Sequence, residues 1–258
     1  DDYGSLGDAY RNLKKFDDAL INYEKALAIN PKDDLSLNGI GLVLLAKSKH
    51  HEAAEKFKQA IDVNPNNFVY YSNLGVALAN LGKLHDAREA FEKALQINPQ
   101  DDISYEWLGL IYNRLGLFSK AIKQFEAALN IKQLPRYYSD IGISYQRLKN
   151  WDKAFSNLKK AAALDPNDKN KLVDLAYAYN DRGLEHYRNN EDDEALKYYK
   201  LALELQPGND IFHWNLYLVY SAKENYAEAE NHLSTAIKLN PNKQEYLQHL
   251  EVLKAKRG

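Results

Sequence analysis

The sequence has 258 residues, of which 45% are hydrophobic and 27% charged, and its 34 lysines and arginines nearly balance its 36 aspartates and glutamates. The chain is long enough to bury a large core, and its balanced charge argues against the clustered basic surface that nucleic-acid binding requires. The absence of cysteine excludes disulfides, thiolate metal sites and a cysteine nucleophile, and no apolar run approaches the roughly 20 residues that span a bilayer.

Six of the seven prolines close nearly identical motifs. The motifs read AINP, DVNP, QINP, ALDP, ELQP and KLNP, and they end at Pro31, Pro65, Pro99, Pro166, Pro207 and Pro241. The first three prolines are 34 residues apart, and the 67-residue gap that follows fits two repeats if Gln133 takes the place of a proline. A fixed period of this length is typical of a repeat protein.

The period divides the chain into seven repeat units and one further helix. In each unit, apolar residues at helical spacing precede a polar break, and a second helical run ends at the proline. We therefore predict a single all-α repeat domain, 1–258, in which every unit is a pair of helices. The expected units are 1–33, 34–67, 68–101, 102–134, 135–168, 169–209 and 210–243, followed by a C-terminal capping helix at 244–258.

Aligned on this period, the units share columns of residues that let two helices pack closely. A glycine recurs in the first helix, for example at Gly41, Gly75 and Gly109. Two alanines recur in the second helix, with a bulky residue such as Phe57 or Phe91 between them. Glycine allows the two backbones to approach, and we expect the bulky side chain to fill the gap toward the next unit.

Two stretches carry these columns together: YSNLGVALANLGKLHDAREAFEKALQINP, at 71–99, and YEWLGLIYNRLGLFSKAIKQFEAAL, at 105–129. They resemble the tetratricopeptide repeat family, whose pattern is Trp-x2-Leu-Gly-x2-Tyr, then Ala-x3-Phe-x2-Ala, then Pro. The resemblance extends over all seven units. It implies a right-handed superhelical solenoid of antiparallel helix pairs, in which the first helix of each pair lines a concave groove.

The sixth unit is seven residues longer than the period. Seven residues are close to two helical turns and change the facing angle by only about 20°. The overlapping motifs LVDLAYAY and YNDRGLEHY both match the first-helix pattern, so we expect a first helix that is extended at its N-terminal end. We interpret the extra turns as a packing or pitch device, with a protruding contact surface as the alternative.

The resemblance also implies which side chains point into the groove. Six consecutive units carry an aliphatic residue directly after the glycine position, and a second apolar column lies near the start of the first helix. An exposed apolar strip usually marks an interaction site, and such a groove takes an amphipathic helix or an extended peptide. The alternative is that superhelical curvature buries these side chains. The predicted apolar groove residues are Leu35, Leu42, Leu45, Val69, Val76, Ile103, Trp107, Leu110, Ile143, Leu184, Trp214 and Leu218.

Four arginines complete the predicted groove. Arg114, Arg147 and Arg188 end the first helix of three consecutive units, and Arg136 begins the first helix of the fifth. We predict that they hold carboxylates of a partner. The alternative is that they only complement the helix C-terminus, which is worth a few tenths of a kcal/mol. No three successive units carry the lysine and asparagine set with which some family members clamp acidic C-terminal peptides.

The sequence shows no phosphate-binding glycine loop, no nucleophile motif and no metal-spaced histidine pair. We therefore predict no enzyme, no catalytic residue, no metal site and no cofactor. We expect a cytoplasmic scaffold that binds a peptide or amphipathic helix of a partner protein, without nucleic acid or membrane insertion. The alternatives are a homo-oligomer, the recognition arm of a larger enzyme or assembly machine, and an engineered repeat protein. Because the chain lacks an initiator methionine, we expect it to be a segment of a longer protein.

Overall fold

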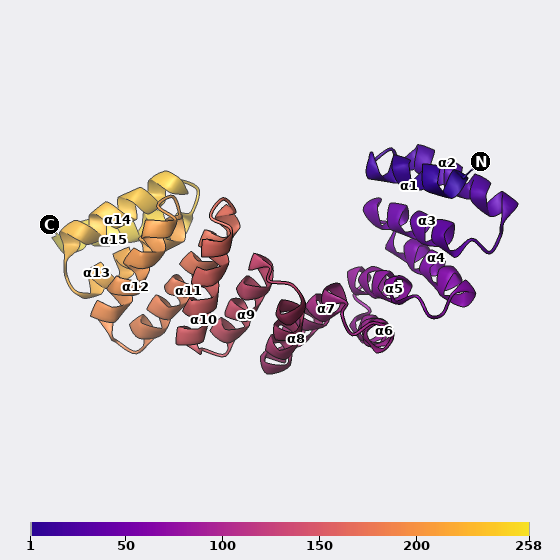
Figure 1. The fold of residues 1–258 in the computed structure, drawn as a ribbon. Coiled ribbons are helices and arrows are strands. Elements are labelled where there is room, and N and C mark those ends of the chain that lie inside the picture. The colour runs from indigo at the N-terminus through magenta and orange to yellow at the C-terminus, as the bar shows by residue number, and fades with distance from the viewer. Residues whose placement is uncertain (1, 258) are drawn as a thin grey trace. The chain divides into compact units, whose positions relative to one another are not determined.

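The structure is a computed structural model that describes residues 2–257, and in this range its regular elements are 15 α-helices (Figure 1). The contacts between them divide the chain into two compact parts, Asp1–Gln133 and Leu134–Gly258. We call these the N-terminal part and the C-terminal part and describe each by itself. The single repeat domain predicted for 1–258 stays a prediction.

The N-terminal part consists of helix pairs (Figure 1). Each odd-numbered helix packs on the even-numbered helix that follows it, and the first helices of neighbouring pairs also contact one another. Its helices are α1 (Tyr3–Asn12), α2 (Phe16–Ile29), α3 (Asp34–Ala46), α4 (His50–Val63), α5 (Phe68–Asn80), α6 (Leu84–Ile97), α7 (Asp102–Arg114) and α8 (Phe118–Ile131).

The C-terminal part repeats this arrangement and ends with one further helix, which packs on α14. Its helices are α9 (Pro135–Arg147), α10 (Trp151–Leu164), α11 (Lys169–Arg188), α12 (Asp192–Leu205), α13 (Asp210–Ala222), α14 (Tyr226–Leu239) and α15 (Gln244–Arg257). α11 has 20 residues, whereas α9 and α13 have 13 each. The additional turns precede the part of α11 that matches α13, so they lie at its N-terminal end.

The helices of a pair approach closely because glycine faces a bulky side chain. A Cβ atom added at Gly41 or at Gly109 would lie 2.5 Å from a ring carbon of Phe57 or Phe125, respectively. Both phenylalanines are fully buried. The bulky side chain thus packs first on the glycine of its own pair, rather than filling only the gap toward the next one.

α3 contains the nearly uncharged stretch GIGLVLLA and is buried on most of its surface. It contacts α1, α2, α4 and α5, and these neighbours cover its apolar sides. The buried residues of α3 are Ser36, Leu37, Gly39, Ile40, Gly41, Val43 and Leu44. An apolar helix is therefore expected at this place in a stack of helices.

The turn inside each pair contains one residue in the left-handed region, with φ between 56° and 75°. Such a residue commonly ends an α-helix, and glycine adopts this conformation without steric cost. Two of these residues are glycines, Gly82 and Gly116; the others are Lys14, Ser48, Lys149, Asn190 and Glu224.

Successive pairs are joined by a recurring set of hydrogen bonds. The Asp34 carboxylate accepts from the Asn64 amide at 3.0 Å and from the Tyr70 hydroxyl at 2.9 Å. In the C-terminal part, Asn240 and Tyr246 donate to Asp210 in the same way, both at 3.0 Å. Burial alone would raise the pKa of Asp210, but these hydrogen bonds and the nearby Lys243 hold that pKa below its ordinary value. The helix after each of these two links is thereby fixed to the pair before it.

Candidate partner-binding site

In the N-terminal part, two columns of apolar side chains lie across α3, α5 and α7. The first column is exposed, with accessible fractions of 66% for Leu35, 37% for Val69 and 45% for Ile103. Side chains seven residues apart lie on the same side of an α-helix, so the second column continues the first along each helix. This second column is half-buried and consists of Leu42, Val76 and Leu110.

The inner sides of these residues contact the core. Leu42 and Leu45 pack against a buried cluster of α2, α3, α4 and α5, and Val76 packs against the cluster around Phe91. The half-buried Trp107 stacks on the Phe91 ring with 6.0 Å between ring centroids. Each of these residues therefore belongs partly to the core and partly to the surface.

In the C-terminal part, the half-buried column is Ile143, Leu184 and Leu218 on α9, α11 and α13. Seven residues earlier on α11 and α13 are exposed apolar residues, Tyr177 at 42% and Ile211 at 41%. On α9 the matching residue is Arg136, which is exposed and lies 4.9 Å from the centroid of the Tyr137 ring. The two-column pattern therefore recurs here, with a cation replacing one apolar residue.

The prediction that Trp214 lines the groove is wrong. Only 8% of Trp214 is exposed, and its ring packs on Tyr246 at 4.7 Å, His249 at 4.8 Å and Tyr217 at 5.0 Å. In the repeat alignment, Asn215 and not Trp214 matches Trp107. A shift of one residue rotates a side chain by about 100° around the helix, which turns Trp214 into the core.

Arg114, Arg147 and Arg188 end α7, α9 and α11. Each follows the half-buried column by four residues, so it continues the same side of its helix. All three side chains are exposed. Among the residues that the structure describes, none of the three has a hydrogen-bond or ion-pair partner.

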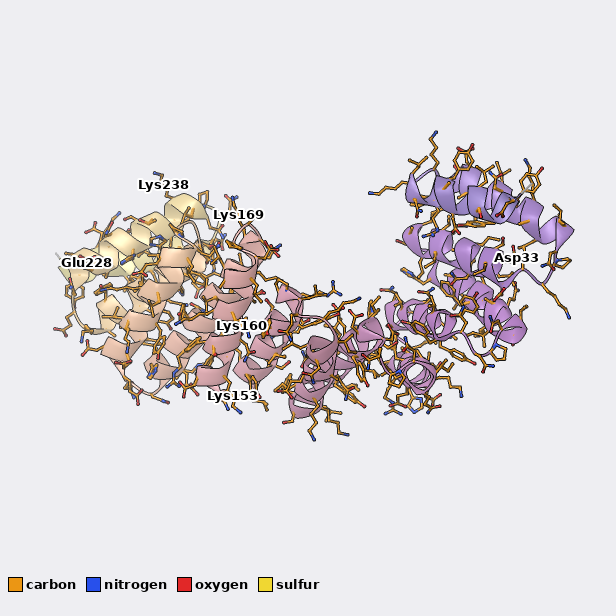
Figure 2. The ribbon with its side chains drawn as sticks, in the orientation of Figure 1. Asp33, Lys153, Lys160, Lys169, Glu228 and Lys238 are labelled. Carbon is orange, nitrogen blue, oxygen red and sulfur yellow. The ribbon has the colours of Figure 1, made fainter. Side chains whose placement is uncertain are left out.

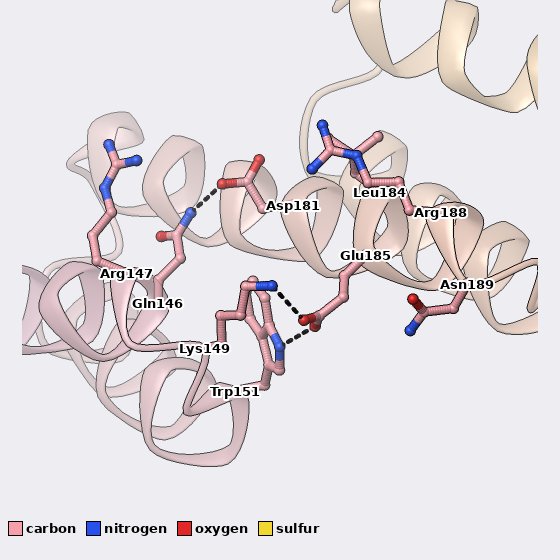
Figure 3. Close-up of a pocket in the computed structure, with 9 residues that line it drawn as sticks. All are labelled: Gln146, Arg147, Lys149, Trp151, Asp181, Leu184, Glu185, Arg188 and Asn189. Atoms are coloured by element: carbon pink, nitrogen blue, oxygen red, sulfur yellow. Dashed lines mark hydrogen bonds and ion pairs between the residues drawn. The ribbon is translucent and has the colours of Figure 1, made fainter.

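A cavity of about 380 Å³ opens between the C-terminal ends of α9 and α11 and the start of α10 (Figure 3). It brings together three predicted groove residues, Arg147, Leu184 and Arg188. Its other lining residues do not appear in the sequence prediction: Gln146, Lys149, Trp151, Asp181, Glu185 and Asn189.

One side of the cavity is a charged network around Glu185. The Glu185 carboxylate accepts from the Trp151 indole N–H at 2.6 Å and from Arg182 at 2.6 Å, and it forms an ion pair with Lys149 at 3.0 Å. Burial alone would raise the pKa of Glu185, but these three donors hold that pKa below its ordinary value. Glu185 is therefore an ionised carboxylate with its own partners.

The second acidic side chain of the cavity also has a partner. The Gln146 amide donates to the Asp181 carboxylate at 2.7 Å, which links α9 to α11 (Figure 3). Both carboxylates of the lining are thus engaged by other groups, whereas Arg147 and Arg188 are not. The lining holds three cations, Arg147, Lys149 and Arg188, against two carboxylates, so the cavity offers a net positive charge to a ligand.

One residue in the sequence, Trp151, could have indicated this cavity. Trp151 stands at the first position of a second helix, where other pairs have Phe16, Leu84 or Phe118. It is the largest side chain at that position, and it is only half-buried. The neighbours of Trp151 on α11 could not have been identified from the period, because the sixth unit is longer than the others.

The sequence matches tetratricopeptide repeat models over nearly its whole length, at 1–33, 38–102, 72–137, 133–207 and 215–243. The chain belongs to the tetratricopeptide repeat family, and its fold is an all-α helical repeat solenoid. The fold is generally a non-catalytic scaffold for interactions between proteins. Among the residues described, no three histidine, aspartate or glutamate side chains are placed to share a metal ion, and no helix is long and apolar enough to cross a membrane.

Solved structures share this fold. MamA is 28% identical, with a TM-score of 0.57 over 61% of this chain and 93% of that chain. YrrB, described as a TPR protein with an unusual peptide-binding site, is 24% identical, with a TM-score of 0.57 over 77% of this chain and 99% of that chain. The C-terminal part of a TPR repeat-containing protein from Cytophaga hutchinsonii is 17% identical, with a TM-score of 0.75 over 95% of this chain and 98% of that chain. No curated protein matches the sequence.

Proposed function

We propose that the chain is a scaffold that binds a peptide or an amphipathic helix of a partner protein on the exposed side of its first helices. The observation that carries this proposal is the pair of apolar columns described above, which we call the first-helix strip. It consists of Leu35, Leu42, Val69, Val76, Ile103 and Leu110 in the N-terminal part and of Ile143, Tyr177, Leu184, Ile211 and Leu218 in the C-terminal part.

The strip has the character of a binding surface rather than of scattered exposed residues. Within each part it continues from one first helix to the next, and these helices contact each other. Several other exposed apolar residues stand singly at helix ends, for example Ile29 and Leu164 as the last residues of α2 and α10. Single exposed apolar side chains are ordinary, whereas a contiguous apolar patch marks an interaction site.

The second helices present a different surface. α10, for example, carries the exposed lysines Lys153 and Lys160 (Figure 2). Charged side chains of this kind are depleted in the buried centre of protein interfaces. The contrast favours the first helices as the docking side, and the peptide-binding site named for YrrB supports a peptide as the class of partner.

The test begins with a library of random 12-residue peptides displayed as N-terminal fusions and selected on the intact chain. The enriched peptides are then synthesised, and their affinity for the protein is measured by fluorescence anisotropy. The decisive variant combines Leu35→Glu, Val69→Glu and Ile103→Glu. These three side chains are the exposed column, so the variant should fold, whereas Leu42, Val76 and Leu110 also contact the core.

The matched control combines Ile29→Glu, Val63→Glu and Leu164→Glu, which add the same charge at exposed ends of second helices. We expect the strip variant to lose at least tenfold in affinity and the control to bind as the native chain does. Equal binding by both variants would contradict the proposal. If no peptide is enriched and light scattering shows a dimer that the strip variant abolishes, the strip serves self-association instead.

The proposal also places the scaffold in the cytoplasm and assigns it no cofactor and no catalytic step. The cysteine-free composition supports this location, because such a chain does not depend on an oxidising compartment for its stability. An attached enzyme or assembly domain in a longer protein is compatible with the same binding surface.

A further inference from the structure

We propose that the cavity between α9, α10 and α11 receives a side-chain carboxylate, Asp or Glu, of the peptide that lies along the first-helix strip. Arg147 and Arg188 supply the positive charge from two sides of the cavity. This inference rests on the proposed function and adds the chemistry of one position in the bound peptide. It concerns an internal side chain of the peptide, not its C-terminus.

The lining of the cavity carries a net positive charge. Glu185 is already bound by Lys149, Trp151 and Arg182, and Asp181 by Gln146. Lys149 and Arg182 balance the charge of Glu185, whereas Asp181 keeps its charge because Gln146 is neutral. Arg147, Lys149, Arg182 and Arg188 still outnumber the two carboxylates, so the site keeps a net positive charge. A guanidinium group pairs well with a carboxylate because its planar donors match both oxygens.

The two arginines lie beside the first-helix strip. They follow Ile143 and Leu184 by four residues, so they stand on the same side of α9 and α11 as the strip. In Figure 3 the guanidinium groups of Arg147 and Arg188 lie to the left and right of the Asp181 carboxylate, and the network of Lys149, Trp151 and Glu185 lies below them. A peptide on the strip thus reaches the arginines directly.

The lining of the cavity combines apolar and charged side chains. Leu184 lines the cavity and also belongs to the strip, so an apolar peptide residue can contact it while its acidic neighbour enters the cavity. The Trp151 ring is held in place by its hydrogen bond to Glu185 and by the Arg182 guanidinium, 5.6 Å from the ring centroid. The Trp151 side of the lining is therefore held in place before a ligand arrives, which reduces the entropy cost of binding.

A role at the helix C-terminus alone makes a different prediction. Arg114 ends α7 just as Arg147 ends α9, and Arg114 does not line this cavity. If these arginines only complement the partial negative charge of the helix end, then replacing Arg114 or Arg147 should have the same small effect on stability and none on binding. The comparison of the two positions separates the explanations.

The experiment uses the selected peptides described above. Their display as N-terminal fusions leaves no free C-terminus, so any enriched acid is a side chain. We expect an acidic residue next to an apolar one in the enriched peptides. Changing this acidic residue to its amide should weaken binding to the native chain about tenfold or more.

The protein variant combines Arg147→Gln and Arg188→Gln. We expect it to lose affinity to the same degree for the acidic peptide, with no further loss when the amide peptide is used. The matched variant Arg114→Gln should lose less than threefold, and Arg147→Lys with Arg188→Lys should retain part of the binding because the charge is kept. The Trp151 indole N–H resonance should shift on addition of the acidic peptide.

Two results would overturn this inference. The first is enrichment of peptides that lose affinity when Tyr177→Glu and Ile211→Glu are combined, at the exposed column of the C-terminal part, but that show no acidic preference. In that case the proposed function stands and the carboxylate site does not. The second is unchanged affinity of the acidic peptide for the variant with both arginines replaced by glutamine, with a native circular dichroism spectrum. If no peptide is enriched, the proposed function and this inference fail together.

Discussion

In most helix pairs a single glycine packs against a single aromatic ring. Gly109 lies against Phe125 so closely that an added Cβ atom would stand 2.5 Å from the ring. The ring is fully buried and cannot move away without disturbing the neighbouring helices. A methyl group at this place must therefore push the two helices apart.

We predict that Gly109→Ala lowers the free energy of unfolding by about 1–3 kcal/mol, the usual cost of overpacking. The matched control is Gly208→Ala, because no heavy atom lies within 4 Å of the position that a Cβ atom would take at Gly208. Urea unfolding followed by circular dichroism measures both. An unchanged midpoint for Gly109→Ala would show that the pair tolerates a wider spacing.

The residue scale also shows what the repeat pattern can and cannot predict. The pattern correctly identified the glycine and ring columns, because their contact recurs in most pairs. It failed for Trp214, which lies one residue away from the Trp107 column and packs inside. A pattern based on residue type predicts an apolar side chain well, but a displacement of one residue decides whether that side chain faces the core or the surface.

At the scale of helices, α13 and α14 are joined by two histidines. His213 Nε2 donates to the Pro207 carbonyl at 3.2 Å, so its Nδ1 accepts from His232 Nδ1 at 2.9 Å. Burial lowers the pKa of both residues from the ordinary 6.5, and for His232 the charge of His213 adds to this effect. The folded protein therefore favours both rings in the neutral form.

This preference predicts a loss of stability in mild acid. Below about pH 6.5 the unfolded chain takes up protons that the folded chain does not, so the free energy of unfolding falls as the pH decreases. We expect the urea midpoint to fall from pH 7.5 to pH 5.5 and the variant His232→Phe to reduce this dependence. The control is His85→Gln at an exposed histidine, and this variant should show the same pH dependence of the urea midpoint as the native chain. If the urea midpoint of His232→Phe falls with decreasing pH as steeply as that of the native chain, this explanation is refuted.

The long helix α11 belongs to the same scale. In its additional N-terminal region, residues 169–175, Leu175 is 5% exposed and the four residues before it are half-buried, so these turns pack against the fold. This observation favours a packing role for the extra turns over a protruding contact surface. The motifs LVDLAYAY and YNDRGLEHY both match the first-helix pattern because each contributes buried residues of α11 that pack against neighbouring helices.

We predict that Leu175→Ala lowers the free energy of unfolding by about 2–5 kcal/mol, as is usual for a buried leucine. Lys169→Ala, at the exposed start of the same helix, should change it by less than about 0.5 kcal/mol. Thermal or urea unfolding distinguishes the two variants. Equal and small effects would show that the additional turns do not pack.

At the scale of the whole molecule, the sequence was sufficient to predict the all-α repeat fold and its family, because seven similar units report the same structure. The site was harder to predict. The strip residues follow from the period, but the cavity depends on Trp151, Glu185 and Asp181. These side chains meet only because α9, α10 and the longer α11 pack together, and no single repeat contains that information.

The central claim is that a peptide docks on the first helices. It is tested most directly by placing a photoreactive amino acid, benzoylphenylalanine, at single positions of the chain and irradiating it with a selected peptide. We predict that a selected peptide crosslinks to exposed first-helix positions of the part that binds it, Leu35 and Ile103 in the N-terminal part or Tyr177 and Ile211 in the C-terminal part. We predict no crosslinks from Ile29 or Leu164 at the ends of second helices. Crosslinks that form equally from Ile29 and Leu164, or only from them, would contradict it.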